Sequence, residues 1–250
     1  MKKKLFLLFL WVDCFASLHE QTKNKQNIEQ IWLGYFNQTR ITDHWGLWGD
    51  LHLRTKEDFT NKFSQSIVRL GLTYYLNDIT KFTVGYARVS LYPGDNHKEV
   101  TQPENRFWQQ LQWHTAFSKT RMMQWIRLEE RYRRKILKDS MLAYGYNFNF
   151  RLRYNILYEV PLSQKKFATK SFAFIVNDEV LINFGKEIVN NYFDQNRFFV
   201  GLKYQTTKHD NIQFGYMNVF QQLSSGNTYK NINAARVFYF HNLDLRKKKV

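Results

Sequence analysis

Arginine and glutamate alternate with apolar residues between positions 121 and 134. Arg127, Glu129, Arg131 and Arg133 occupy every second position, and the opposite parity is mostly apolar, as at Leu128. Side chains two residues apart on an extended strand share a face, so these opposite charges would gather on one side. The planar fork of arginine matches a carboxylate with two hydrogen bonds. This pattern suits a buried network of ion pairs better than a catalytic centre.

The same polar parity recurs in other segments with an extended pattern. A solvated face of a soluble β-protein is one interpretation, but such faces usually carry Lys, Glu, Ser and Thr. Here the polar positions are rich in Arg and Asn with interleaved carboxylates. We therefore predict that they fill the lumen of a barrel. The predicted lumen network consists of Asp50, His52, Arg127, Glu129, Arg131, Arg133, Asn147, Asn149, Arg151, Arg153, Glu179, Arg197, Lys203 and Arg236.

Histidine is the usual general base of a hydrolase, so its neighbours decide whether catalysis is supported. His52 shares a face with Asp50, and His114 shares one with Gln110 and Gln112. Neither histidine has an evident serine partner on its own strand, although a cross-strand partner stays open. The sequence also lacks a cysteine pair, an HExxH motif and a calcium loop. We predict no catalytic residues, no metal site and no cofactor.

The segment 144–158 indicates what kind of element carries these side chains. Its even positions are aromatic or aliphatic, and its odd positions before the last are Gly, Asn or Arg. Tyr144 and Tyr146 lie at one end, and Tyr154 and Tyr158 lie at the other. Tyrosine suits a boundary between hydrocarbon and water, so these four residues are the predicted aromatic girdle of a membrane-crossing strand. A soluble sandwich would alternate in the same way with its apolar face inward.

A strand pattern returns about every twenty residues, and many of these segments reach the nine to eleven residues that a membrane-crossing strand needs. Short turns alternate with longer loops, as in outer-membrane barrels. We predict an all-β fold, an antiparallel up-and-down transmembrane β-barrel of about 10–12 strands in a single domain. Eleven segments are found, although bacterial barrels usually have even numbers. The segments are 29–40, 44–54, 63–76, 80–92, 105–117, 121–134, 142–158, 171–184, 196–206, 210–222 and 231–246.

The N-terminus has the pattern of an export signal. A basic start at Lys2 to Lys4 precedes an apolar run from Leu5 to Val12, which is too short to span a bilayer. Small residues before position 17 predict a signal peptide over 1–16 with cleavage after Ala16. A membrane anchor or a lipoprotein signal at Cys14 fits less well. The remaining parts are an N-terminal segment 17–28, a barrel domain 29–246 and a basic tail 247–250.

Composition agrees with a barrel and argues against a nucleic-acid partner. The chain has 22 Phe, 15 Tyr and 7 Trp, yet its mean hydropathy is only −0.54 because a barrel exposes just half of each strand to lipid. The net charge is +16. The arginines follow the lumen parity instead of forming one surface patch, and the lysines at the chain ends suit anionic lipid. Solvated tails are the alternative for those lysines.

Several motifs together resemble a known family, the domain-of-unknown-function family 2490 of outer-membrane β-barrel-like proteins. The similarity covers nearly all of the chain after the signal peptide, and it implies a barrel in the outer membrane of a Gram-negative bacterium of the Bacteroidota type. It implies no chemistry for any residue. The motifs are Arg127-Leu128-Glu129-Glu130-Arg131, Asn177-Asp178-Glu179-Val180-Leu181-Ile182-Asn183, Asn196-Arg197-Phe198-Phe199-Val200-Gly201-Leu202-Lys203-Tyr204, Phe214-Gly215-Tyr216-Met217 and Val237-Phe238-Tyr239-Phe240-His241-Asn242-Leu243.

These patterns predict a monomeric outer-membrane barrel of uncharacterised, structural or envelope-related role. A narrow pore that favours anions is the first alternative, and a lipid-active hydrolase is the second. The expected partners are outer-membrane lipids and the barrel-insertion machinery, which would recognise a signal near Val237 to Leu245. No nucleic-acid partner is expected. Whether the lumen is open or plugged stays undecided at this point.

Overall fold

The computed structural model describes residues 24–56, 59–93, 99–163 and 168–246. The predicted signal peptide 1–16, residues 17–23 of the predicted N-terminal segment and the basic tail 247–250 lie outside the described residues. No helix in the described part is long and apolar enough to cross a membrane. Eleven strands form instead: β1 (Asn24–Arg40), β2 (Trp45–Lys56), β3 (Lys62–Tyr75), β4 (Thr80–Leu91), β5 (Gln102–Ala116), β6 (Arg121–Lys138), β7 (Met141–Pro161), β8 (Ser171–Phe184), β9 (Phe193–Gln205), β10 (Asp210–Gln222) and β11 (Thr228–Asp244).

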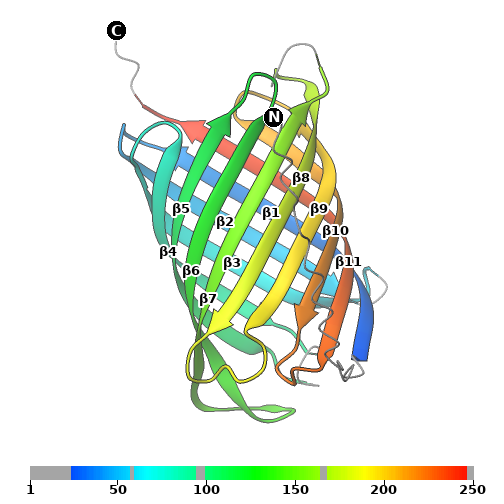
Figure 1. The fold of residues 1–250 in the computed structure, drawn as a ribbon. Helices are drawn as coiled ribbons and strands as arrows, with labels where there is room; N and C mark the ends of the chain where they lie inside the picture. Colours follow the sequence, from blue (N-terminus) through cyan, green and yellow to red (C-terminus); the bar gives the residue numbers. More distant parts are fainter. Residues whose placement is uncertain (1–23, 57–58, 94–98, 164–167, 247–250) are drawn as a thin grey trace, which may run out of the picture.

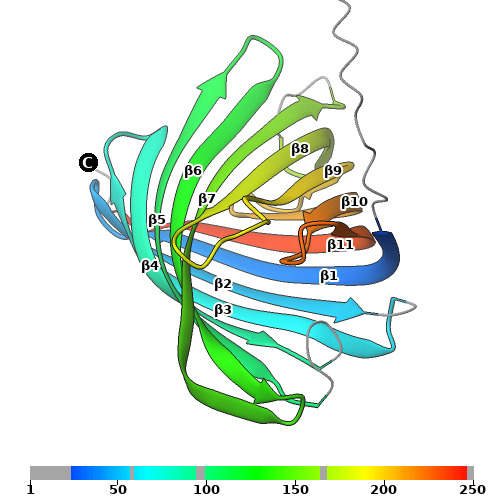
Figure 2. The same cartoon turned by 60° about the horizontal axis from the view of Figure 1, so that its bottom comes forward.

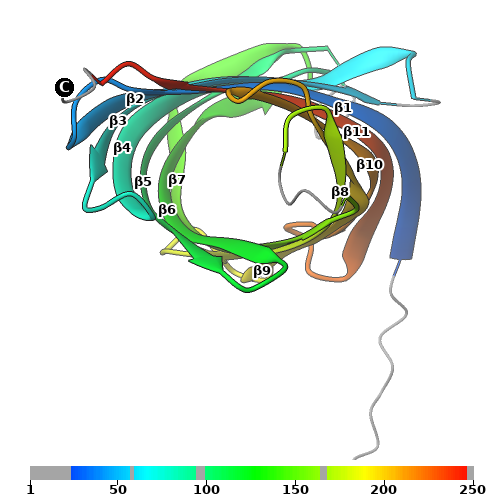
Figure 3. The same cartoon turned by 90° about the horizontal axis from the view of Figure 1, so that it is seen from above.

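The strands close into a single barrel in which each strand pairs with its neighbours in the chain (Figure 1). Every neighbouring pair is antiparallel except β1 with β11, which closes the ring in parallel. Asn24 lies opposite Thr228 there, and Arg40 lies opposite Asp244. Eleven strands of alternating direction leave the first and last running the same way, so the closing pair must be parallel. The view along the barrel shows this closed ring (Figure 3).

The all-β barrel prediction is confirmed, and its eleven segments correspond to the eleven observed strands. The bounds 171–184 and 210–222 coincide with β8 and β10. The first strand starts earlier than predicted, at Asn24, so residues 24–28 of the predicted N-terminal segment belong to the wall. The barrel ends at Asp244, two residues before its predicted end.

The predicted segments 121–134 and 142–158 leave a loop at 135–141 between them. This loop prediction is wrong, because β6 continues to Lys138 and β7 already begins at Met141. Pairing of β6 with β5 reaches only Arg133, and pairing of β7 with β8 begins at Phe150. The tip of the β6–β7 hairpin therefore projects past its neighbours (Figure 2). Tyr144 and Tyr146 lie on this projecting part of the hairpin and are both exposed, and their place in an aromatic girdle stays a prediction.

The two faces of the wall differ sharply in chemistry. Along β3, Val68, Leu70 and Leu72 point outward and are exposed, whereas Arg69 and Thr73 point inward and are buried. Other strands repeat this inversion of a soluble protein, with apolar side chains outside and polar ones inside. Tyr154 and Tyr158, the other predicted girdle residues on the wall, also point outward. The interior of the barrel is thus the polar compartment of this molecule.

Aromatic side chains also enter the interior, and glycines make room for them. Trp108 of β5 is 1% exposed and lies opposite Gly85 of β4, which in turn pairs with Gly71 of β3. A Cβ atom on Gly85 would clash with the Trp108 indole and with the backbone oxygen of Leu70. The indole therefore lies over two glycines, and its position depends on them.

Candidate functional site

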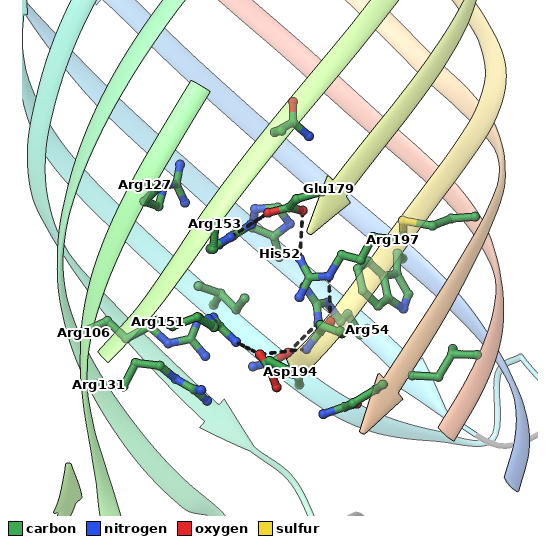
Figure 4. A pocket seen from close by; sticks show the side chains of 18 of the residues that line it. His52, Arg54, Arg106, Arg127, Arg131, Arg151, Arg153, Glu179, Asp194 and Arg197 are labelled. Atoms are coloured by element: carbon green, nitrogen blue, oxygen red, sulfur yellow. Dashed lines mark hydrogen bonds and ion pairs between the residues drawn. The ribbon is translucent and has the colours of Figure 1, made fainter. Parts of the chain in front are cut away.

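A cavity of about 600 Å³ lies inside the barrel. Its lining runs from loop residues such as Ser224 to inner positions near the opposite strand ends, such as Gln38 and Gln112. Among the charged side chains of that lining the basic ones dominate, and many of them are drawn together in Figure 4. The lining arginines are Arg54, Arg69, Arg106, Arg127, Arg131, Arg133, Arg151, Arg153, Arg197 and Arg236.

One carboxylate at the centre of the wall serves several of these arginines. Glu129 of β6 is 1% exposed and accepts a hydrogen bond of 2.9 Å from Arg151 Nε and one of 2.6 Å from Arg153 Nη1. Arg106 Nη1 lies 3.7 Å from the same carboxylate. Because these strands are neighbours, alternation alone brings Glu129 opposite Arg151 in the sheet register. A buried charge is tolerable only when paired and hydrogen-bonded, and Glu129 meets both conditions.

Glu104 of β5 also pairs with several arginines, and it lies nearer the end of the barrel that carries the longer loops. Arg131 binds it with two hydrogen bonds, from Nε at 3.0 Å and from Nη2 at 3.1 Å, and Arg133 Nε donates at 2.8 Å. Arg106 donates to it as well. Glu104 is completely buried, so three guanidinium groups converge on a carboxylate that water does not reach. Such bidentate pairs hold side chains in one geometry.

The network extends to β8 and β9 through two more carboxylates. Glu179 accepts a hydrogen bond of 2.6 Å from Arg153 Nε and lies 3.4 Å from Arg197 Nη1. Asp194 accepts one of 2.8 Å from Arg151 Nη1. Figure 4 shows Arg153 and Arg197 reaching toward Glu179 from β7 and β9, the strands on either side of β8. The paired wall, defined here as Glu104, Glu129, Glu179 and Asp194 with their arginines on β5 to β9, is therefore continuous.

A separate ion pair lies near the short-turn end. Lys203 Nζ donates to Glu159 Oε1 at 3.0 Å, and Arg121 donates to the same carboxylate at 2.8 and 2.9 Å. Neither Glu159 nor Lys203 lines the cavity. Lys203, a predicted lumen residue, thus belongs to a local pair and not to the central network.

Arg54, Arg236 and Arg127 are held differently from the arginines of the paired wall. Arg54 and Arg236 form no ion pair with a carboxylate anywhere in the described residues, and Arg127 reaches Glu129 only at 3.9 Å. Their hydrogen-bond acceptors are amides: Gln65 for Arg54, Gln213 for Arg236 and Gln110 for Arg127. Each also packs on aromatic rings, such as Trp32 beneath Arg54. These three cations are thus oriented without being neutralised.

Asp50 and His52 form a small cluster on the inner face of β2. Asp50 accepts a hydrogen bond of 2.6 Å from Trp48 Nε1 and lies 3.3 Å from Arg69 Nη1. His52 Nε2 lies 3.0 Å from Asp50 Oδ1. The other candidate for catalysis, His114, lies 3.0 Å from Gln112. Within the described chain, each histidine therefore meets a carboxylate or an amide and no hydroxyl nucleophile.

The structure brings most of the predicted lumen residues to the cavity. Asp50 and Glu129 lie behind its lining, and Asn147 lies exposed at its mouth. Asn149 donates to Asn183 at 3.3 Å. Those that line the cavity are His52, Arg127, Arg131, Arg133, Asn147, Asn149, Arg151, Arg153, Glu179, Arg197 and Arg236.

Sequence reasoning missed several charged residues of this interior. Three carboxylates fall just outside the predicted segments and were therefore not assigned to a face of the wall: Glu104, Glu159 and Asp194. Arg106 lies inside the predicted segment 105–117, and extending that segment by one residue would have included Glu104 on the same face. It also missed the inward aromatics, because one parity was assigned to lipid wherever aromatic residues occurred. Trp32 and Trp48 are buried inside.

The interior carries a clear excess of positive charge. Ten arginines and Lys230 line the cavity. Against them stand six carboxylates in or behind its lining: Asp50, Glu104, Glu129, Glu179, Glu187 and Asp194. Among the described residues, and leaving aside Lys230, which has an interaction of its own, the arginines exceed these carboxylates by four. No group of three or more possible metal ligands occurs within the described ranges. The chemistry that this arrangement offers is attraction and hydrogen bonding of anions.

Comparisons with known proteins find a family profile and a weakly similar solved structure. The profile of a family described as "Protein of unknown function (DUF2490)" matches residues 29–230. No curated protein matches the chain. A solved structure titled "NanC porin structure in rhombohedral crystal form" is similar with 14% sequence identity and a TM-score of 0.49, over 86% of this chain and 99% of that chain. The strand pairing described above establishes the barrel independently of that likeness.

Proposed function

Since the chain belongs to the DUF2490 family of proteins of unknown function, we propose from its geometry that it is an outer-membrane β-barrel whose narrow lumen favours small anions. Two separate properties support this proposal. The outer face suits a lipid environment, and the inner cavity suits negatively charged solutes. The first property concerns location, and the second concerns function.

The outer face supports a membrane location. Leu70, Val84, Ile182 and many similar side chains are exposed on it, and such an apolar surface is costly in water. The shortest strands, β2 and β4, have 12 residues. At about 3.3 Å per residue and a tilt of about 40°, such strands span roughly 30 Å, enough for the apolar band of about 25 Å in outer-membrane barrels. The predicted signal peptide agrees with export.

The cavity is long and narrow along the barrel axis. On β11 its lining extends from Lys230 to Phe240. That stretch rises roughly 25 Å along the barrel axis for strands of ordinary pitch and tilt. A volume of about 600 Å³ spread over this length makes a narrow path, suited to small solutes one at a time.

The excess of arginine carries the proposal for anions. A purely structural network would match guanidinium and carboxylate groups, as the paired wall does. Arg54 and Arg236 instead face the cavity with amide acceptors and no ion pair to a carboxylate of the described residues. Arg127 also has an amide acceptor and reaches Glu129 only at 3.9 Å. Fixed positive charge inside a low-dielectric wall raises the local concentration of anions and repels cations.

Two experiments test the location and the selectivity separately. Fractionation and gel mobility with and without boiling test the location, because folded outer-membrane barrels migrate differently before heating; a soluble periplasmic protein without a mobility shift contradicts it. Planar-bilayer recording under a KCl gradient tests the selectivity. The reversal potential is expected to lie on the side of the Nernst potential of chloride. A cation-selective or non-conducting barrel contradicts the channel.

A further inference from the structure

Three inward side chains form a row across the parallel seam of the barrel. Trp32 of β1 lies directly opposite Arg236 of β11 on one side and directly opposite Arg54 of β2 on the other. All three line the cavity. The seam row, as we call Arg236, Trp32 and Arg54, therefore places two arginines at the strand positions that flank one tryptophan.

Both guanidinium groups of the seam row are oriented by amides, and neither forms an ion pair with a carboxylate of the described residues, although the charge of Glu179 acts on Arg236 from farther away. Arg54 Nη1 donates to Gln65 at 2.8 Å, and Arg236 Nη2 donates to Gln213 at 2.9 Å. The Nε atom of each has no hydrogen-bond partner. The strongest charges acting on Arg54 are those of other arginines, with Arg197 first. A buried cation without a counterion is costly, and a bound anion would relieve that cost.

An aromatic surface adjoins the seam row inside the cavity. Phe238 follows Arg236 on the same face of β11, and its ring centroid lies 5.2 Å from that of Phe36 and 5.4 Å from that of His52. Gly34 leaves room for Phe238, because a Cβ there would lie 2.7 Å from its ring. Phe36, Phe238 and His52 all line the cavity. A ligand at the seam row thus meets charge on one part and flat apolar surface on another.

We infer that the seam row binds the carboxylate of a small organic acid with a flat apolar body. This inference rests on the proposed anion-favouring lumen and names the class of anion. The fork of Arg236, whose Cζ lies 4.5 Å from the Phe238 ring centroid, takes the carboxylate oxygens, and the apolar body packs against Phe238 and Phe36. Arg54, on the other side of Trp32, adds positive charge to the same cavity. An inorganic anion leaves the aromatic surface unused. A hydroxyl-rich acid brings hydroxyl groups to an aromatic wall that offers them few hydrogen-bond partners.

Titration calorimetry of the full chain, folded in detergent, tests the ligand class with three probes. Benzoate carries the carboxylate and the flat ring, gluconate carries the carboxylate with hydroxyl groups, and inorganic phosphate carries charge alone. We expect benzoate to bind at least about tenfold more tightly than the other two. Equal or tighter binding of gluconate or phosphate, or no benzoate binding, overturns the inference.

Substitutions locate the site. Arg54→Gln and Arg236→Gln each remove one unneutralised cation, and each is expected to weaken benzoate binding by about tenfold or more. Arg133→Gln is the matched control, because it removes an equal lumen charge that Glu104 already pairs. Its expected effect is below about twofold, as for a distant screened charge. If Arg133→Gln weakens binding as much as the seam variants, the lumen attracts anions only by its total charge and the site is refuted.

The outcomes separate this inference from the proposed channel. A barrel that conducts no ions but binds benzoate through Arg54 and Arg236 removes the channel and leaves the site. A barrel that conducts chloride but does not prefer benzoate removes the site and leaves the channel. The probe series on the unmodified protein does not depend on whether any variant folds.

Discussion

Arginines serve different roles on the two sides of the lumen, the paired wall and the seam row. On the paired wall, Arg151 and Arg153 share Glu129, so each positive charge is compensated within the protein. At the seam row, Arg54 and Arg236 have only amide acceptors and aromatic neighbours. Burial is similar on the two sides, but compensation is not. Ion pairing with a carboxylate, and not burial, therefore distinguishes the arginines that stabilise the barrel from the arginines available to a ligand.

The largest expected effect comes from breaking the paired wall. Glu129→Gln keeps the size of the side chain but leaves Arg151 and Arg153 short of a counterion, which costs about 3–5 kcal/mol of unfolding free energy. Denaturant unfolding followed by tryptophan fluorescence measures it. The control is Glu130→Gln, because Glu130 lies on the outer face with one contact of 3.4 Å from Gln109. Equal effects of the two substitutions would show that the paired wall stabilises nothing.

A substitution under Trp108 tests the boundary between the two sides, where Arg127 packs over that indole at 4.5 Å. Gly85→Ala places a methyl group against the indole and a backbone oxygen, and we expect a loss of about 1–3 kcal/mol from overpacking. Gly49→Ala is the matched control, since its methyl group meets only Leu70 at 3.9 Å. The same unfolding assay applies, and a stable Gly85→Ala variant would contradict the tight contact described here.

Removing a cation from the seam row is expected to change stability little. Arg54→Met deletes a buried charge that has no counterion, so the loss of its Gln65 hydrogen bond is offset by relief of desolvation. The net change is expected to be below about 1 kcal/mol in either direction. A loss as large as that of Glu129→Gln would place Arg54 among the structural arginines and would remove the contrast between the two sides.

The smallest effect is expected at an exposed pair outside the lumen. Arg40 donates to Asp78 in the turn after β3, and this hydrogen bond lowers the pKa of Asp78 below its ordinary value. A depressed carboxyl pKa stabilises the fold above the unfolded pKa, and the contribution disappears as pH falls through the folded pKa. Asp78→Asn should therefore be slightly less stable than the parent at pH 6, with the difference shrinking at about pH 3. A difference that grows on acidification would contradict the pairing.

Local patterning predicts the elements of this molecule well, because a barrel strand is recognised by alternation alone. The segments 171–184 and 210–222 end where β8 and β10 end. Parity also assigns Arg127, Glu129 and Arg151 to one face without any knowledge of their partners. What alternation cannot give is the register between strands, and register decides that Arg151 meets Glu129 while Arg54 meets Gln65.

The aromatic interior could not be predicted for a related reason. On β1 both parities carry aromatic residues, with Tyr35 outside and Trp32 inside. The inward place of Phe238 depends on Gly34 of the neighbouring strand, 204 positions earlier in the chain, and no local pattern links the two. The excess positive charge at the seam row could not be predicted from the sequence either, because a paired and an unpaired arginine cannot be told apart until the hydrogen-bond acceptor is known.

The parallel closure of β1 on β11 has a consequence for labelling the protein. Because the two strands run the same way, Asn24 and Asp244 lie at opposite ends of the barrel. In an even-numbered up-and-down barrel, the start of the first strand and the end of the last strand would lie at the same rim. Epitopes attached before Asn24 and after Arg246 would therefore sit on opposite faces of whatever layer the barrel crosses. An antibody that cannot cross this layer would reach only one of them in intact cells.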